Sequence, residues 1–239
     1  KQQLWNDLKC SSITMKNIKN LEYKKNSLIR FFTEFNVCSN SDFINYEKKQ
    51  KIDLFNLTLR PRLNNSFLNI QNTRYNTLDT KFGNKSSIGY GIEVEYIFPF
   101  NKNKWSVFIE PTYQNYKAEQ TTDAKNVYGG KILSEVNYNS IEIPVGIRYY
   151  FFINSNSKIF INTCFIFDYS SKTSIEFKRA DGSSYNSLDI NSKNNLAIGI
   201  GYKLNDKYGV EFRYQTKREI LKDYVSWSSN YKTVSIIFG

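Results

Sequence analysis

Three glutamates, Glu93, Glu95 and Glu110, are the residues of this sequence whose type and spacing could do chemistry. Neighbouring carboxylates can act as a general acid and base, or can bind a divalent cation. The chain contains no histidine, which is the commonest general base and a common metal ligand. The three carboxylates also match no specific catalytic or metal-binding spacing. We therefore expect no catalytic residue, no metal and no cofactor, and we interpret the protein as not being an enzyme.

The three cysteines, Cys10, Cys38 and Cys164, lack the CxxC spacing of a zinc site. Cys10 and Cys38 flank one short segment, in which Phe31 and Phe35 recur at helical spacing. In an oxidising compartment these two cysteines can form a disulfide. The pattern predicts a small helical segment over residues 1–48, closed by a Cys10–Cys38 disulfide, with Cys164 inside a later strand.

The elements that must position the glutamates are strands, because residues 87–100, SIGYGIEVEYIFPF, place a large apolar side chain at every second position from Ile88 to Phe98. Eight segments share this period of two. They are residues 54–63, 87–100, 105–116, 140–151, 159–169, 196–204, 208–215 and 232–239.

Short polar turns (NKNK, NSNS and NDK) join three pairs of these segments, whereas the other connections are long. The long connections are residues 71–85, 121–133, 172–194 and 216–230, and the third contains the hairpin signal Asp181-Gly182. Short turns at one end and long loops at the other are typical of an outer-membrane β-barrel, and an even strand count puts both barrel ends on one side. No apolar run is long enough for a transmembrane helix.

In a soluble β protein the apolar face of each strand lies inside, as in a lipocalin-like binder whose apolar face lines a ligand cavity. Two features favour the opposite orientation here. The polar face is rich in small residues, which suit the narrow interior of an eight-stranded barrel. Aromatic residues also gather where strands end, as in an interfacial girdle. We therefore predict an all-β membrane protein, an eight-stranded antiparallel up-and-down transmembrane β-barrel over residues 49–239, with its apolar face toward lipid.

The same alternation predicts a charged lumen in which six acids face five bases. They are Arg60, Arg62, Glu93, Glu95, Glu110, Glu142, Arg148, Asp168, Lys203, Glu211 and Arg213. Unpaired charges away from water are very costly, whereas nearly balanced charges can pair. We interpret this set as a polar plug that fills the barrel.

Three stretches, SIEIPVGIRYYF, NNLAIGIGYKLNDKYGVEFRYQ and YKTVSIIFG, resemble the small porin-like outer-membrane β-barrel proteins of Bacteroidota-type bacteria. The resemblance covers residues 51–239, and this family shares no catalytic residues. It implies that residues 1–48 match a segment preceding the barrel in longer members. It also implies a C-terminal aromatic residue, whereas this chain ends on Phe238-Gly239.

The net charge of +11 raises the question of a nucleic-acid partner. The excess is spread along the chain, with nine Lys or Arg and five Asp or Glu in residues 1–50, so we expect solvated charge and no nucleic acid.

We expect outer-membrane lipid and lipopolysaccharide as partners, together with other envelope proteins, and periplasmic barrel termini. The expected function is that of an anchor or accessory subunit in an envelope assembly. The alternatives are a narrow pore or transport protein and, less favoured, a soluble lipocalin-like binder.

Overall fold

The computed structural model describes residues 1–41, 54–170 and 173–239, and the chain divides into two compact units, residues 1–52 and 53–239. The first unit contains α1 (Gln2–Asp7), α2 (Met15–Lys19) and α3 (Lys25–Cys38). Its small apolar core is formed by Ile13, Ile18, Leu21 and Phe31. A disulfide joins Cys10 to Cys38, the last residue of α3. Within the described part of the chain, no helix has the length and apolar character needed to cross a membrane.

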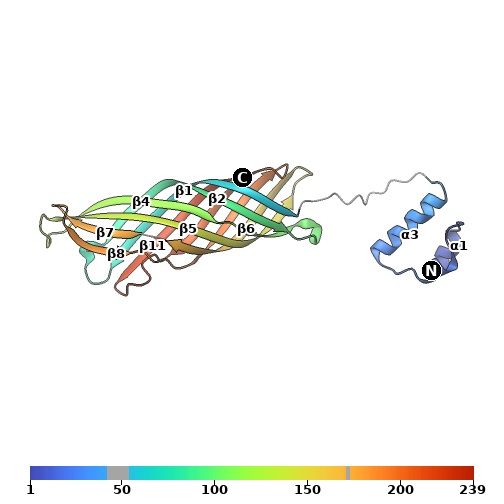
Figure 1. The fold of residues 1–239 in the computed structure, drawn as a ribbon, viewed down its shortest axis with the longest axis horizontal. Coiled ribbons are helices and arrows are strands. Elements are labelled where there is room, and N and C mark those ends of the chain that lie inside the picture. The colour runs from blue at the N-terminus through green and yellow to red at the C-terminus, as the bar shows by residue number, and fades with distance from the viewer. Residues whose placement is uncertain (42–53, 171–172) are drawn as a thin grey trace. The chain divides into compact units, whose positions relative to one another are not determined.

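The second unit is an antiparallel barrel, as the two-residue alternation predicted (Figure 1). Its strands are β1 (Phe55–Asn72), β2 (Thr80–Ile97), β3 (Trp105–Ile109), β4 (Thr112–Asp123), β5 (Lys131–Phe152), β6 (Ser157–Ser170), β7 (Ser174–Arg179), β8 (Ser184–Asp189), β9 (Asn195–Leu204), β10 (Tyr208–Arg218) and β11 (Trp227–Phe238). Two short 3-10 helices, η1 (Asn76–Leu78) and η2 (Asn101–Asn103), lie in connections. The pairing of β1 with β11 closes the ring.

The ring has eight strands because three pairs of these segments each continue one strand. β3 and β4 follow one another along β5 and are separated at Pro111, which has no N–H for the ladder. β6 and β7 likewise follow one another along β5, and β8 and β9 continue on their far side. The predicted eight-stranded barrel is thereby confirmed.

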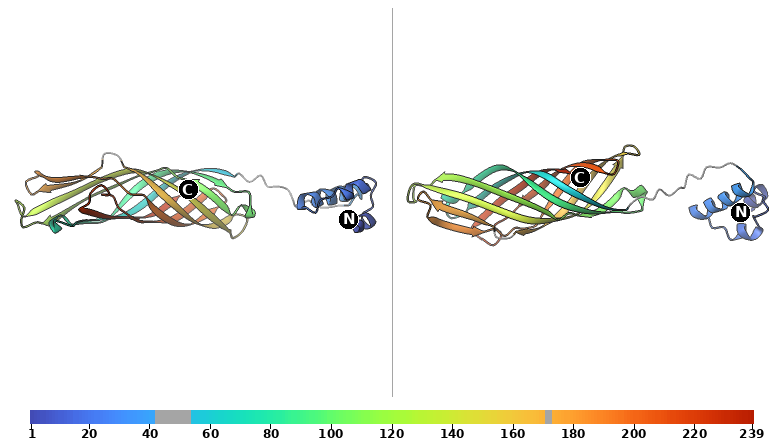
Figure 2. Two further views of the ribbon diagram at one scale, coloured as in Figure 1. Left: turned by 90° about the horizontal axis from the view of Figure 1, so that it is seen from below. Right: turned by 45° about the horizontal axis from the view of Figure 1, so that its top comes forward.

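The strands are longer than the sequence analysis predicted. β1 and β2 extend into residues 71–85, and β7 and β8 form a hairpin around Asp181-Gly182. The first residue of β1 and the last residue of β11 both lie at the end of the barrel that carries the short turns, because Phe55 pairs with Tyr96 and Phe238 pairs with Val210. Because β1, β2 and β5 are long, these strands and the β7–β8 hairpin extend past the shorter strands at the end of the barrel that carries the long connections (Figure 2).

The outward face of the barrel near the short turns is a band of exposed apolar side chains. Its side chains are between 49% and 72% exposed at Leu57, Leu59 and Leu63 on β1 and at Ile88 and Ile92 on β2. On β1 the band runs over residues 55–63, close to the roughly 9–11 residues that a tilted strand needs to cross a bilayer. This face suits lipid, because such a continuous apolar surface is unfavourable in water.

Beyond this band the polarity of the two faces reverses. Leu68 and Ile70 point inward from β1, on the same face as Arg60 and Arg62. They belong to an apolar core between two sheets, β2–β1–β11 and β4–β5–β7–β8, which separate because the β2–β4 ladder ends at the Tyr90–Tyr113 pair. The core contains Leu68, Ile70, Leu78, Phe82, Tyr116, Ala118, Ala124, Ile132, Val136, Tyr138, Ile175, Phe177, Leu188, Ile190, Ile220, Leu221, Trp227 and Tyr231. The interior of the barrel is therefore charged at the level of the outward apolar band. Beyond that band, toward the long connections, the interior is apolar.

Candidate functional site

The charged interior is centred on Arg148 of β5, whose guanidinium reaches past β3 to β2 on the inside of the barrel. Its Nη1 and Nη2 donate to Glu93 at 3.0 and 2.6 Å, and Nη1 also donates to Glu95 at 3.0 Å. The guanidinium carbon lies 4.7 Å from the ring centre of Phe108 and 4.5 Å from that of Phe160. Carboxylates at its edge and aromatic rings near its faces hold this cation in the barrel centre.

Glu95 takes four further partners in the lumen, and one of them is the side-chain amide of Asn56, which donates to it at 3.2 Å. The hydroxyl groups of Tyr150 and Ser106 donate to it at 2.5 and 2.7 Å, and Lys203 Nζ lies 3.8 Å from its other oxygen. Glu95 itself is fully buried. A buried carboxylate needs such partners, because an unpaired one would lose its hydration without replacement.

Glu110 and Glu211 tie the opposite wall into the same network. Arg213 donates to Glu211 at 2.7 Å and to Glu110 at 2.8 Å. Arg62 pairs with Glu110, and Arg60 pairs with Glu211. Every one of these residues is at most 3% exposed, so the pairs are packed against one another inside the barrel.

A second group lies farther along the lumen, around Glu142. Arg218 and Gln215 donate to Glu142 at 2.5 and 3.0 Å, and Arg218 Nη1 lies 3.5 Å from Asp168. The hydroxyl group of Tyr138 donates to Asp168 at 2.9 Å. Glu142 and Asp168 therefore share one base, Arg218.

A layer of tyrosines separates this second group from the apolar core. The ring of Tyr231 lies 5.3 Å from that of Tyr138 and 5.6 Å from that of Tyr116. The Arg218 guanidinium lies 5.2 Å from the Tyr231 ring. The hydroxyl groups of Tyr138 and Tyr231 donate to Asp168 and Ser66, while their rings belong to the apolar core, which suits a boundary between charged and apolar interiors.

All eleven lumen residues predicted from the sequence point into the barrel, and ten of them are buried as whole residues. The exception is Asp168, which is half-buried as a residue although its side chain is covered. The prediction missed two inward bases, Arg218 and Lys158. Arg218 and Lys158 raise the lumen set to seven bases against six acids, and Lys158 pairs with Asp206 at 2.5 Å.

Inward glycines make room for these groups. A methyl group at Gly199 would collide with Glu211 and Asn162, and one at Gly201 would collide with the ring of Phe160. These two glycines lie in the middle of β9, with no helix after them. Their role here is close packing, since a residue with a side chain would not fit opposite the charged groups.

The candidate acid–base glutamates are engaged in ion pairs. Glu93, Glu95 and Glu110 are each at most 2% exposed and each is held by an arginine. Within residues 1–41, 54–170 and 173–239, no group of three or more His, Cys, Asp or Glu side chains could hold a metal ion. The arrangement leaves the carboxylates paired with bases and away from any solvent-filled cleft.

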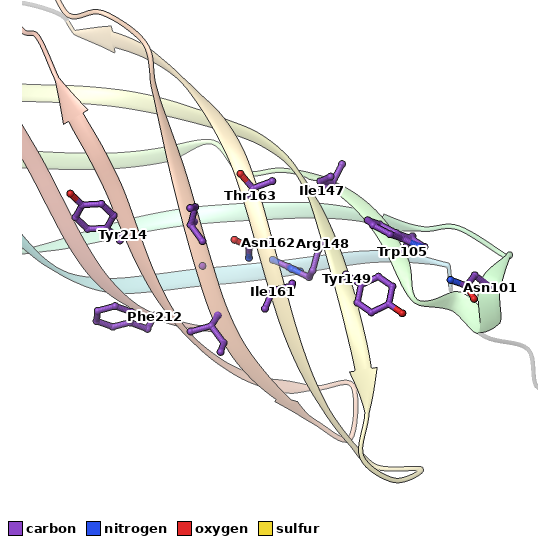
Figure 3. A pocket seen from close by; sticks show the side chains of 13 residues that line it. Asn101, Trp105, Ile147, Arg148, Tyr149, Ile161, Asn162, Thr163, Phe212 and Tyr214 are labelled. Atoms are coloured by element: carbon purple, nitrogen blue, oxygen red, sulfur yellow. The ribbon is translucent and has the colours of Figure 1, made fainter.

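The outward apolar face carries a broad groove of about 1010 Å³ across β5, β6, β9 and β10 (Figure 3). Trp105 and Tyr149, whose ring centres are 4.8 Å apart, lie on one side of it, and Phe212 and Tyr214 lie on the other. Ile161 contributes to its apolar lining. A groove of this composition on the apolar band fits the acyl chains of lipid.

Charged groups outside the apolar band behave differently, because they lie in water. At the tip of the β7–β8 hairpin, hydrogen bonds from the hydroxyl group and amide of Ser183 lower the pKa of the Asp181 carboxyl. On β7, hydrogen bonds to Glu135 and Glu176 raise the pKa of Lys178. In the two-sheet region beyond the apolar band, polar pairs therefore lie on the outer surface and the interior is apolar.

Comparison with known proteins gives one family match. The model of the outer membrane protein β-barrel domain matches residues 23–239. No curated protein matches the chain.

Solved structures of similar proteins include three from other bacteria. The attachment invasion locus protein Ail of Yersinia pestis, solved with the heparin analogue sucrose octasulfate, is 14% identical, with 75% of this chain and 96% of that chain covered and a TM-score of 0.34. Neisserial surface protein A is 10% identical, with 76% and 97% covered and a TM-score of 0.34. A Pseudomonas aeruginosa FadL homologue is 10% identical, with 70% and 45% covered and a TM-score of 0.30. Similarity this low carries no argument about ligands or partners.

Proposed function

Because the chain belongs to the outer membrane protein β-barrel domain family, we propose that it is an anchor or accessory subunit of an envelope assembly, held in the bacterial outer membrane by a closed barrel. The observation that carries the proposal is the filled lumen. Arg148, Glu93, Glu95 and Glu211 are each at most 2% exposed and meet in the middle of the barrel. A barrel of eight strands is only just wide enough for its own side chains, which leaves no room for a solute.

The proposal assigns the barrel no catalytic role, since its inward carboxylates are committed to arginines. It puts the outward apolar band against lipid and lipopolysaccharide. It also puts the barrel ends and the three short turns in the periplasm, with the disulfide-bonded helical unit as a surface for other envelope proteins. The disulfide between Cys10 and Cys38 supports this location, because disulfides form and persist in the oxidising periplasm.

Fractionation and vesicle permeability test the proposal together. The full chain should sediment with outer membranes after a high-salt wash. Vesicles that contain the purified protein should retain a small encapsulated dye as well as vesicles without protein do. Recovery in the soluble fraction would contradict the membrane anchor, and rapid dye release would favour the narrow-pore alternative.

A further inference from the structure

A second cavity, of about 480 Å³, lies at the long-connection end of the barrel. It is built by three segments: the β1–β2 connection, strand β8 and the β10–β11 connection. Its volume lies within the range of small-molecule sites. Neither the lumen network nor the apolar band uses this cavity.

Aromatic side chains form much of its lining. Tyr75 and Tyr185 are 64% and 40% exposed, and Tyr224 is half-buried. Leu78 and Trp227, both buried, extend the lining toward the apolar core. A ligand in this cavity would therefore meet exposed aromatic rings and an apolar surface beneath them.

The lining segments are fixed to one another. Thr73 donates its amide and hydroxyl hydrogens to the carbonyl of Ser226, at 2.9 and 3.2 Å, which joins the β1–β2 and β10–β11 connections. The hydroxyl group of Tyr224 accepts the amide of Asp189 at 2.9 Å, which joins the β10–β11 connection to β8. The cavity is thus formed before any ligand arrives, which reduces the ordering cost of binding.

Polar groups in the lining have unused hydrogen-bonding capacity. Asn72 is 6% exposed, and its side-chain carbonyl accepts the amides of Arg74 and Tyr75, while its side-chain nitrogen has no partner among the described residues. The Arg74 guanidinium also has no partner there. Asp223 uses one carboxylate oxygen for Asn191, at 2.6 Å. Amide, guanidinium and carboxylate groups together offer both donors and acceptors.

We propose that this cavity binds a short neutral saccharide of two or three rings. The ring hydrogens of a pyranose form an apolar face that packs on an aromatic ring, while its hydroxyl groups need donors and acceptors around the edge. A wholly apolar ligand would leave Asn72, Arg74 and Asp223 desolvated without partners. A strongly anionic ligand would meet the Asp223 carboxylate as well as Arg74.

The test is a fluorescence titration of the full chain in detergent, with Trp5→Phe and Trp105→Phe so that Trp227 is the remaining tryptophan. The probes are maltotriose and triacetylchitotriose, and mannitol serves as an acyclic polyol control. At least one trisaccharide should change the Trp227 emission saturably, and mannitol should not. Removing a stacking ring should weaken binding about tenfold in Tyr185→Ala.

Tyr128→Ala is the matched control, because Tyr128 is an exposed tyrosine outside the cavity lining. It should leave the affinity unchanged, and Asn186→Ala, which removes an amide from the lining, should weaken binding without removing a ring. No saturable response to either trisaccharide would overturn the proposal. An equal response to mannitol, or equal affinities in Tyr185→Ala and Tyr128→Ala, would do the same. The closed lumen is not involved in this measurement, so failure here leaves the anchor proposal standing.

Discussion

Arg148 on β5 binds Glu93 on β2 through two parallel hydrogen bonds, at 3.0 and 2.6 Å, although β3 lies between those strands in the ring. The pair therefore bridges past β3 on the inside of the barrel and joins two strands that are not neighbours. Both side chains are 2% exposed. Bidentate arginine–carboxylate pairs are strong and geometrically specific, so this pair fixes β2 and β5 relative to one another.

Replacing Arg148 should destabilise the barrel. Arg148→Ala leaves Glu93 and Glu95 buried without their main partner, and breaking such a buried pair costs about 3–5 kcal/mol. The free energy of unfolding in urea, measured in lipid vesicles, checks this. The control Arg74→Ala removes an exposed arginine and should change the free energy by less than about 0.5 kcal/mol. Equal losses in the two variants would show that the central network contributes no special stability.

If the outward apolar band faces lipid, the stability cost of an introduced arginine should depend strongly on its position along β5. Ile143→Arg puts a charge on the lipid face of β5 and should cost about 2–4 kcal/mol. Asn137→Arg, on the same face but beyond the band, should cost little, because Asn137 is exposed among polar groups. Unfolding in vesicles and insertion efficiency measure the difference. Equal tolerance of the two arginines would contradict the position of the bilayer.

The reversed interior predicts a second contrast, on β1. Ile70 is fully buried in the apolar core, so Ile70→Ala should cost about 2–5 kcal/mol of unfolding free energy. Leu63 is 52% exposed on the outward band, so Leu63→Ala should cost less, since the removed atoms leave no internal cavity. The same urea unfolding in vesicles compares the two variants. A larger loss in Leu63→Ala would place the packed core elsewhere.

The inward face of each strand could be assigned from the sequence because the side chains of a strand alternate between two faces. With one face assigned to lipid, Arg60, Glu95 and Arg213 have to point inward. The sequence could not say which arginine meets which carboxylate. That choice depends on the stagger of the strands around the ring, as in the Arg148–Glu93 pair, which joins strands that are not neighbours.

Arg218 and the apolar core lie outside the prediction for different reasons. On β10 a register shift between Gln215 and Arg218 interrupts the two-residue alternation, so Arg218 points inward from a position that the alternation assigns to the outward face. The apolar core has another cause. The alternation continues beyond the membrane band, but the apolar residues change sides, so Leu68 occupies the face of Arg60. Apolar residues on a single face therefore mark only part of each strand, and by that criterion residues 216–230 belong to a connection. The signal that could have found the apolar core is the unbroken period of two in residues 55–72, followed without regard to which face is apolar.

The helical unit should depend on its disulfide. Closing 28 residues of chain is worth about 3–4 kcal/mol in the chain-entropy model, a large share of what so small a core can supply. Reduction, or the Cys10→Ser and Cys38→Ser double substitution, should make residues 1–41 sensitive to protease while the barrel persists. Cys164→Ser is the control, because Cys164 is the free cysteine of the barrel. Unchanged protection after reduction would show that the unit does not need the disulfide.

The β7–β8 turn should weaken in acid. The lowered pKa of Asp181 means that its stabilising effect is present above the ordinary carboxyl pKa and is lost as the pH falls through the lowered value. Amide exchange at Ser183 should therefore speed up, relative to distant amides, when the pH is brought down through that range. In Asp181→Ala the exchange should be fast throughout and should lose this extra pH dependence. An identical pH profile in the two proteins would contradict the assigned role of the carboxylate.

The most direct test of the closed barrel is the ionic current through the purified protein in a planar bilayer. Protease accessibility of the reconstituted protein should first confirm that it is inserted. The salt bridges of Arg148, Arg213 and their carboxylates predict a current no greater than that of the lipid alone. Steady, ion-selective single-channel steps from the unmodified protein would contradict the closed lumen and establish a pore.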